Sequence, residues 1–303
     1  MKRGERITNS ILEGGLKLSA LLAIFLIFLI FIFIFKEALP IFTNPGVRSE
    51  VDLRDLFASS VWQPVSDHPR FSLLPLFLGT LKLSLIAILF ATPLALGAAI
   101  FTAEFAPRAL KETIKPGIEI LAGIPSVVMG AFALLTLASV LQGIFGWTMR
   151  LNALNAGIAL GLAIVPTIYS VADDSLRAVP GSFREAAYAL GATKLKMIAR
   201  VILPQAFSGI LTGAILSVSR GAGEVAPILF TGAAYFLPYI PKLPTDQFME
   251  LGYHIFVLST QSPDVDKTQP LLYGTILVLL LLTLALNTFA IGLRVRMRRK
   301  YGR

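Results

Sequence analysis

Six long apolar stretches restrict the folds open to this chain of 303 residues more than any other feature of its sequence. A helix needs about 20 mostly apolar residues to cross the hydrocarbon core of a bilayer. Inside the bilayer, helices satisfy their own backbone hydrogen bonds, which irregular segments exposed to lipid cannot do. The sequence therefore predicts an all-α integral membrane protein with six transmembrane helices. The predicted spans are residues 18–36, 73–102, 118–141, 153–172, 205–232 and 270–293.

The composition agrees with a membrane protein, because only 15% of the residues are charged and 55% are hydrophobic. Soluble domains carry about 25% charged residues. The net charge of +9 does not indicate a nucleic-acid interface, since the basic residues lie at span ends instead of among aromatic residues. The sequence contains no cysteine, which excludes disulfides and thiolate metal sites. The first apolar run is too long for a signal peptide, and we expect an uncleaved span.

The distribution of Lys and Arg sets the expected orientation. With the N-terminus inside, the inner segments hold 18 of these residues and the outer segments hold 7. Cytoplasmic loops carry the excess of positive charge, so both termini are predicted to be cytoplasmic. The two long outer loops, 38–72 and 233–269, either pack on the outer face and help to receive a partner or are simple connectors. His68 and His254 fall in these loops, and we expect both to be solvated.

An inner segment carries the motif Glu185-Ala186-Ala187-x3-Gly191-x9-Val201-x-Leu203-Pro204. Ser182 lies three residues before Glu185, the spacing of a capping box at a helix start. Gly191 can end this helix in the left-handed conformation. Thr193 can cap a second short helix, which Pro204 is expected to interrupt. We predict a helix-turn-helix whose narrow apolar ridge consists of Phe183, Ala187 and Leu190, with Arg184, Lys194 and Lys196 along its edges.

Arg220 and Glu224 lie inside the fifth predicted span. Four residues apart on one helix, they would share a face and pair. Charged side chains at such depth are costly unless they face protein or water. We favour a gate in which a passing anion competes with Glu224 for the Arg220 guanidinium, since planar donors bind tetrahedral oxyanions well. A structural pair that locks two helices together is the alternative.

Four further carboxylates, Glu104, Glu119, Asp173 and Asp174, lie near the inner ends of predicted spans. We interpret them as interfacial, in contact with solvent or with a partner protein. The sequence contains no Gly-x4-Gly-Lys-Ser/Thr loop, so any ATP must be bound by another chain. No catalytic residues, metal site or cofactor are predicted, and we do not expect this chain to be an enzyme.

The loop motif resembles the EAA loop of binding-protein-dependent ABC importers, EAA-x3-G-x9-I-x-LP, and departs from it only at Val201. From about residue 58 onward the chain is similar to the permeases of the phosphate ABC importer, the PstA/PstC family, and its tail is closer to PstA. The resemblance rests mainly on the stretches Leu121–Ser126, Arg184–Gly191 and Ser219–Glu224.

This resemblance implies a type I importer permease with the MetI-like fold. Residues 1–72 would hold the first span and an outer loop, residues 73–296 the permease core with its coupling loop at 182–204, and residues 297–303 a basic tail. The residues implied to couple the permease to an ATPase are Glu185, Ala186, Ala187, Gly191, Leu203 and Pro204. Arg220 and Glu224 match the charged positions of the translocation pathway.

The implied partners are a PstC-like second permease, two PstB-like ATP-binding subunits, and a PstS-like phosphate-binding protein outside the plasma membrane. Together they would import inorganic phosphate by alternating access. A permease for another oxyanion, such as sulfate or molybdate, and a passive channel or membrane scaffold are the alternatives. The first of these keeps the fold and changes only the transported anion, and the EAA-type loop argues against the second.

Overall fold

The computed structural model describes residues 3–45, 53–63, 70–237, 239–262 and 265–301. Six helical segments in these ranges are long and apolar enough to cross a membrane, as the sequence predicts. They are Leu12–Thr43, Leu74–Phe105, Ser126–Phe145, Ala153–Arg177, Lys194–Gly221 and Thr268–Arg296. The described part of the chain is helical apart from turns and two isolated bridges, Gln63 with Arg70 and Ala233 with Phe248.

The elements follow one another along the chain, and π-helical segments are labelled η. They are α1 (Arg3–Ala38), α2 (Pro40–Thr43), α4 (Leu53–Ala58), α5 (Leu74–Ile100), η1 (Phe101–Phe105), α6 (Arg108–Ala122), α7 (Ser126–Phe132), η2 (Ala133–Leu137), α8 (Ala138–Phe145), α9 (Ala153–Arg177), α10 (Gly181–Ala189), α11 (Lys194–Met197), η3 (Ile198–Ile202), α12 (Leu203–Gly221), α13 (Ala226–Thr231), α14 (Leu251–Thr260) and α15 (Val265–Tyr301).

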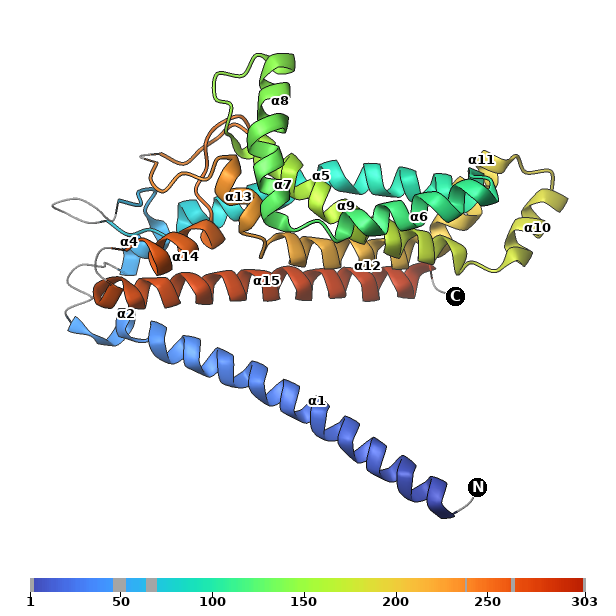
Figure 1. The fold of residues 1–303 in the computed structure, drawn as a ribbon, viewed down its shortest axis with the longest axis horizontal. Coiled ribbons are helices and arrows are strands. Elements are labelled where there is room, and N and C mark those ends of the chain that lie inside the picture. Colours follow the sequence, from blue (N-terminus) through green and yellow to red (C-terminus); the bar gives the residue numbers. More distant parts are fainter. Residues whose placement is uncertain (1–2, 46–52, 64–69, 238, 263–264, 302–303) are drawn as a thin grey trace.

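Helices α5 and α9 form the centre of the bundle, and small residues allow them to approach closely. A Cβ atom at Gly161 of α9 would lie 2.7 Å from the Phe90 ring of α5. The same helix turns its buried Leu160, Ile164 and Ile168 into the main core. Helix α12 packs along α9 and continues the chain from α10 and α11 into the membrane-spanning bundle (Figure 1).

The third and fifth spans differ from their predicted boundaries because each is broken. The run 118–141 is interrupted after Ala122, where Pro125 cannot continue the ladder of hydrogen bonds and disfavours helix in the preceding residue. The span restarts at Ser126 and reaches Phe145. The fifth helix begins at Lys194 and ends at Gly221, before a turn and the separate helix α13.

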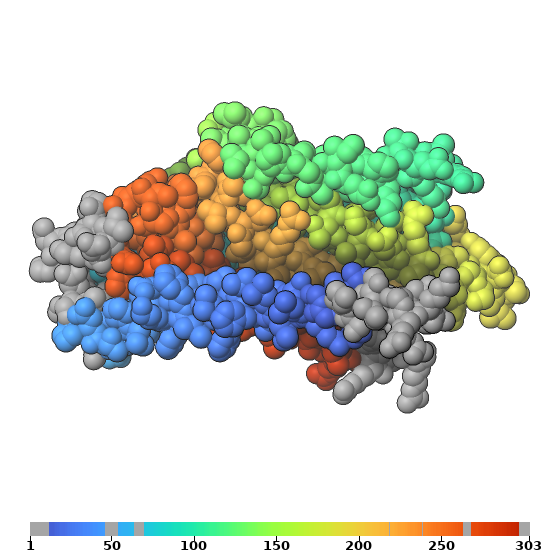
Figure 2. Space-filling view, turned by 60° about the horizontal axis from the view of Figure 1, so that its bottom comes forward, coloured from blue at the N-terminus to red at the C-terminus, as the bar shows by residue number. Residues whose placement is uncertain are grey.

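Both termini lie at the same end of the bundle as α10 and α11, whereas α2, α4 and α14 lie at the opposite end (Figure 1). This arrangement agrees with an even number of spans and with the predicted common side for the termini. The segment around α10 and α11, yellow in Figure 2, forms the tip of the molecule at that end.

At the other end, the two long loops pack into a second core around Trp62 and are not simple connectors. The expectation that His254 is solvated is wrong: it is fully buried on α14, against the edge of Trp62. Its Nδ1 and Nε2 each lie 2.9 Å from a carbonyl oxygen, those of Glu250 and Tyr235. Burial lowers the pKa of His254 to about 4, against the opposing effect of these two carbonyls. His68 lies outside the described residues.

Candidate coupling loop and membrane cavity

The predicted helix-turn-helix is present, and Gly191 ends its first helix as expected. Gly191 has a φ of 75°, in the left-handed region. Its N–H donates to the Tyr188 carbonyl at 2.9 Å, and the Ala192 N–H donates to the Ala187 carbonyl at 3.0 Å. These two bonds form a Schellman motif, which satisfies carbonyls left free at the helix end. Thr193 caps α11 as predicted, because its Oγ1 accepts from the Lys196 N–H at 3.4 Å.

Two local expectations for this loop are wrong. Ser182 and Glu185 do not form a capping box, since α10 begins at Gly181 after Pro180 and has no side-chain cap. Pro204 does not interrupt the second helix either, because α11 continues through η3 into α12. In η3 the Leu203 N–H donates to the Ile198 carbonyl, five residues back. This wider turn precedes Pro204 and accommodates a residue that has no N–H to donate.

The apolar surface of the loop also differs from the predicted ridge. Ala187 is buried against the inner core, and Arg184 turns toward the bundle instead of edging the ridge. Glu185 and Ala186 are exposed. The large apolar side chains that are exposed on α10, on α11 and in the turn between them are Phe183, Tyr188, Leu190 and Leu195, and Leu190 is 88% exposed.

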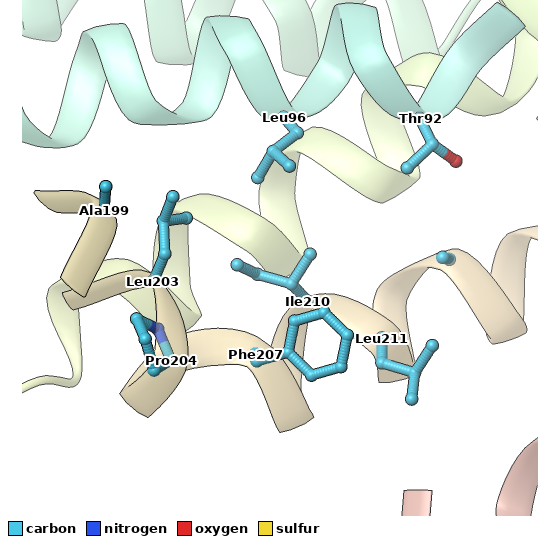
Figure 3. Close-up of a pocket in the computed structure, with 9 residues that line it drawn as sticks. Thr92, Leu96, Ala199, Leu203, Pro204, Phe207, Ile210 and Leu211 are labelled. Carbon is cyan, nitrogen blue, oxygen red and sulfur yellow. The ribbon is translucent and has the colours of Figure 1, made fainter. Parts of the chain in front are cut away.

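Leu203 and Pro204, the last two residues of the motif, lie away from this surface. They line an apolar groove of about 450 Å³ between α5 and α12. Figure 3 shows Thr92 and Leu96 of α5 on one side of it, with Leu203 and Ile210 pointing toward them from the other. The motif therefore divides into an exposed part at 185–186, a glycine turn, and a half-buried part at 203–204 that lines the groove.

Arg220 and Glu224 are brought together as predicted, although not on one helix. Arg220 is in the last turn of α12, and Glu224 follows in the turn before α13. The Glu224 N–H donates to the Gly221 carbonyl at 3.2 Å, which keeps this turn compact. The Arg220 Nε lies 3.6 Å from the Glu224 Oε1, and 54% of the Arg220 side chain is exposed. This is a loose ion pair at a half-exposed arginine side chain.

A cavity of about 220 Å³ lies beside this pair, at the break between α6 and α7. Ile124, Pro125 and Ser126 line it from that break, and Arg220 and Glu224 line it from the turn after α12. Two interrupted helices thus meet around one cavity in the membrane-spanning part of the chain. Broken helices that line a cavity are a common construction for transporter binding sites.

Arg220 also lines a second cavity, of about 520 Å³, between α12 and α15. Ser219 and Asn287 contribute polar groups to it, and Arg294 lies at its boundary on α15. The sequence alone assigned neither Asn287 nor Arg294 to a cavity. Their place in this cavity depends on how α12 and α15 pack, and the spacing of residues within one helix does not predict that packing.

Two of the four inner carboxylates are buried, contrary to the expectation of an interfacial position. Asp173 is fully buried and lies 2.8 Å from the Arg177 Nε and 3.6 Å from the Lys115 Nζ. Glu104 pairs with Arg184. Asp174 and Glu119 are exposed, as expected. The hydrogen bond from Lys115 to Asp174 raises the pKa of Lys115 above its usual value. The spacing of Asp173 and Arg177 could have indicated their pairing.

Comparison with known proteins connects these features. Residues 95–303 match the family described as binding-protein-dependent transport system inner membrane component. The probable ABC transporter permease protein YqgH of Bacillus subtilis is 34% identical over 62% of this chain. The match spans 61% of the length of YqgH. The phosphate transport system permease protein PstC of Xylella fastidiosa (strain 9a5c) is 30% identical over 85% of this chain and 84% of its own length.

The fold is shared with a solved structure of the MetNI methionine ABC transporter in an inward-facing conformation. The TM-score is 0.60 at 17% identity, over 74% of this chain and 95% of that one. The MetI-like fold and the resemblance to the phosphate permeases are thereby confirmed. The matched family covers more than half of the chain, and this protein belongs to the binding-protein-dependent transport system inner membrane components.

Proposed function

We propose that this chain is a transmembrane permease subunit of an ATP-driven importer of inorganic phosphate. Its partners would be a second permease of the PstC type, two ATP-binding subunits of the PstB type and an extracytoplasmic phosphate-binding protein of the PstS type. The observation that carries the proposal is the exposed helix pair α10–α11 at the tip of the bundle, on the side of both termini. Its apolar side chains and its glycine turn suit a groove on a cytoplasmic ATPase.

The coupling role is assigned to Glu185, Ala186, Ala187, Gly191, Leu203 and Pro204. Glu185 and Ala186 would contact the ATPase directly, since both are exposed. Ala187, Leu203 and Pro204 would hold the loop against the bundle, since they pack inward. Gly191 would fix the angle between α10 and α11 through its left-handed turn.

The pathway role is assigned to Arg220 and Glu224. A guanidinium that is half exposed and only loosely paired at 3.6 Å can accept a phosphate oxyanion in exchange for the carboxylate. The adjoining cavities provide space for the anion on both sides of Arg220. Several relatives are phosphate transport system permease proteins, which supports phosphate over other oxyanions.

The test is transport by the complex that co-purifies with this chain from its native membrane. It is reconstituted in liposomes with ATP trapped inside, and the binding protein and labelled phosphate are added outside. Phosphate is expected to accumulate only with ATP, and excess sulfate or molybdate is expected not to compete. Absence of an ATPase from the complex, uptake without ATP, or preferential uptake of another oxyanion would each contradict the proposal.

A further inference from the structure

The inner end of α5 contacts both helices of the coupling loop through two consecutive residues of η1. Glu104 pairs with Arg184 on α10, where the Arg184 Nη2 lies 2.7 Å from the Glu104 Oε1. Phe105 lies under the Lys194 Nζ on α11, which is 4.6 Å from the ring centroid. A π-helical segment at the end of a helix often marks a functional site. One short segment at the end of α5 therefore contacts both helices of the loop.

Arg184 also binds α9 and the chain that leaves it. Its Nη1 donates to the Val179 carbonyl at 2.7 Å, and its Nη2 donates to the Leu176 carbonyl at 3.0 Å. Its Nε donates to the Glu104 Oε1 at 3.2 Å. Every nitrogen of the guanidinium is thus bonded, and the bonds fix α10 relative to both α5 and α9.

The ion pair is shielded, which makes it rigid. The Glu104 side chain is 6% exposed and that of Arg184 is 24% exposed. Bonds between a planar guanidinium and a carboxylate restrict orientation as well as distance. Separation of the pair would leave each charge without its partner in a poorly solvated environment. The free-energy cost of that state keeps the two side chains together.

We propose that the Glu104–Arg184 ion pair transmits the movement of the coupling loop to α5 and α9. This inference rests on the proposed function. Both residues are positioning residues, because they contact neither ATP nor the transported anion. When an ATPase displaces α10, the inner ends of α5 and α9 move with it as one unit. Without the pair, α10 moves alone, and ATP is hydrolysed without the matching movement of α5 and α9.

A second buried carboxylate provides a matched control. Asp173 is fully buried at the same end of the bundle, pairs with Arg177 and Lys115, and accepts a hydrogen bond from the Thr102 hydroxyl of η1 at 3.4 Å, so it links α9 to α6 and to the end of α5. Among the described residues none of these partners lies on α10, whereas Glu104 pairs with Arg184 of that helix. Loss of a buried charge as such should therefore affect D173N and E104Q alike, whereas loss of transmission should affect E104Q alone.

The experiment compares E104Q, R184Q, their double variant and D173N in the reconstituted complex. ATP hydrolysis, phosphate uptake, subunit stoichiometry and melting temperature are measured for each. We expect E104Q and R184Q to keep the ATPase bound and its hydrolysis within about twofold of wild type, and to lower phosphate delivered per ATP at least about tenfold. The double variant should fall no further than the worse single variant. D173N should melt earlier with an unchanged ratio.

A chemical bridge keeps the test decisive if E104Q lowers assembly. The chain contains no cysteine, so a variant with Glu104→Cys and Arg184→Cys has one pair of thiols in this subunit. A reducible bifunctional thiosulfonate should restore the ratio to within about threefold of wild type, and reduction should abolish it again. A ratio that stays at the wild-type value in E104Q, falls equally in D173N, or does not respond to the bridge would overturn the inference. A wild-type complex without phosphate uptake would refute the proposed function instead.

Discussion

Substitution of Gly191 by Ala isolates the contribution of one backbone conformation to the coupling loop. Gly191 has a φ of 75°, and a Cβ atom added there meets no atom within 4 Å. The methyl group therefore causes no collision, and the cost is conformational. A left-handed backbone costs an alanine about 1 kcal/mol more than a glycine, which changes an opening equilibrium about fivefold. Amide hydrogens of α10 should exchange with solvent faster by that factor in G191A.

Gly181 supplies the matched control, since it lies at the other end of α10 and also has open space around its Cβ position. Its backbone is helical, so alanine should leave α10 unchanged or stabilise it by up to about 0.5 kcal/mol. Asparagine tolerates the left-handed region, and G191N should lie between wild type and G191A. Hydrogen exchange of the purified complex, followed on the peptides that cover α10, measures all three. Equal exchange in G191A and G181A would refute the argument from the positive φ.

Three further outcomes are expected. R220Q should abolish phosphate uptake while the subunits still co-purify, because the cavity loses its cation; loss of assembly would instead favour a structural pair. L190D should weaken co-purification of the ATPase at least about tenfold, since it places a charge on a side chain that is 88% exposed and apolar; unchanged binding would place the contact elsewhere. With a folded pKa of about 4 against 6.5, His254 binds its proton more readily when unfolded, so stability should fall by up to about 3 kcal/mol as the pH drops through this window. The raised pKa of Glu250 has the opposite effect, since it stabilises the folded protein at low pH. The contribution of His254 is therefore isolated by comparing the pH dependence of the melting temperature in wild type and H254N. Equal pH dependence in the two proteins would contradict the lowered pKa of His254.

The spans could be predicted because apolar length is a local property of the sequence. Their interruptions were harder to place, because the run 118–141 is apolar on both sides of Pro125 and hydropathy does not register a break in hydrogen bonding. The Gly191 turn was predictable for the opposite reason. Only a few neighbouring residues determine a helix end of this kind.

The site was predictable to the extent that it depends on short spacings. Arg220 and Glu224 meet although α12 ends between them, because the turn that follows keeps backbone hydrogen bonds from each N–H to the carbonyl three residues earlier. Glu104 and Arg184 are 80 residues apart in the sequence. They meet only because the folded chain places α10 beside η1, at the end of α5. His254 was misplaced because its loop contains polar residues and prolines, whereas its burial comes from distant aromatic neighbours such as Trp62.

The packing of α1 has a consequence for biogenesis. Along most of its length α1 is exposed, and it diverges from the bundle toward the N-terminus (Figure 1). Its main neighbour is α15, and Phe33 meets the edge of Tyr273 with ring centroids 5.7 Å apart. Because α1 precedes α15 by most of the chain, α1 is synthesised well before its main neighbour. The exposed apolar side chains of α1 suit contact with lipid during that interval, and the two helices can associate only after α15 has also been made.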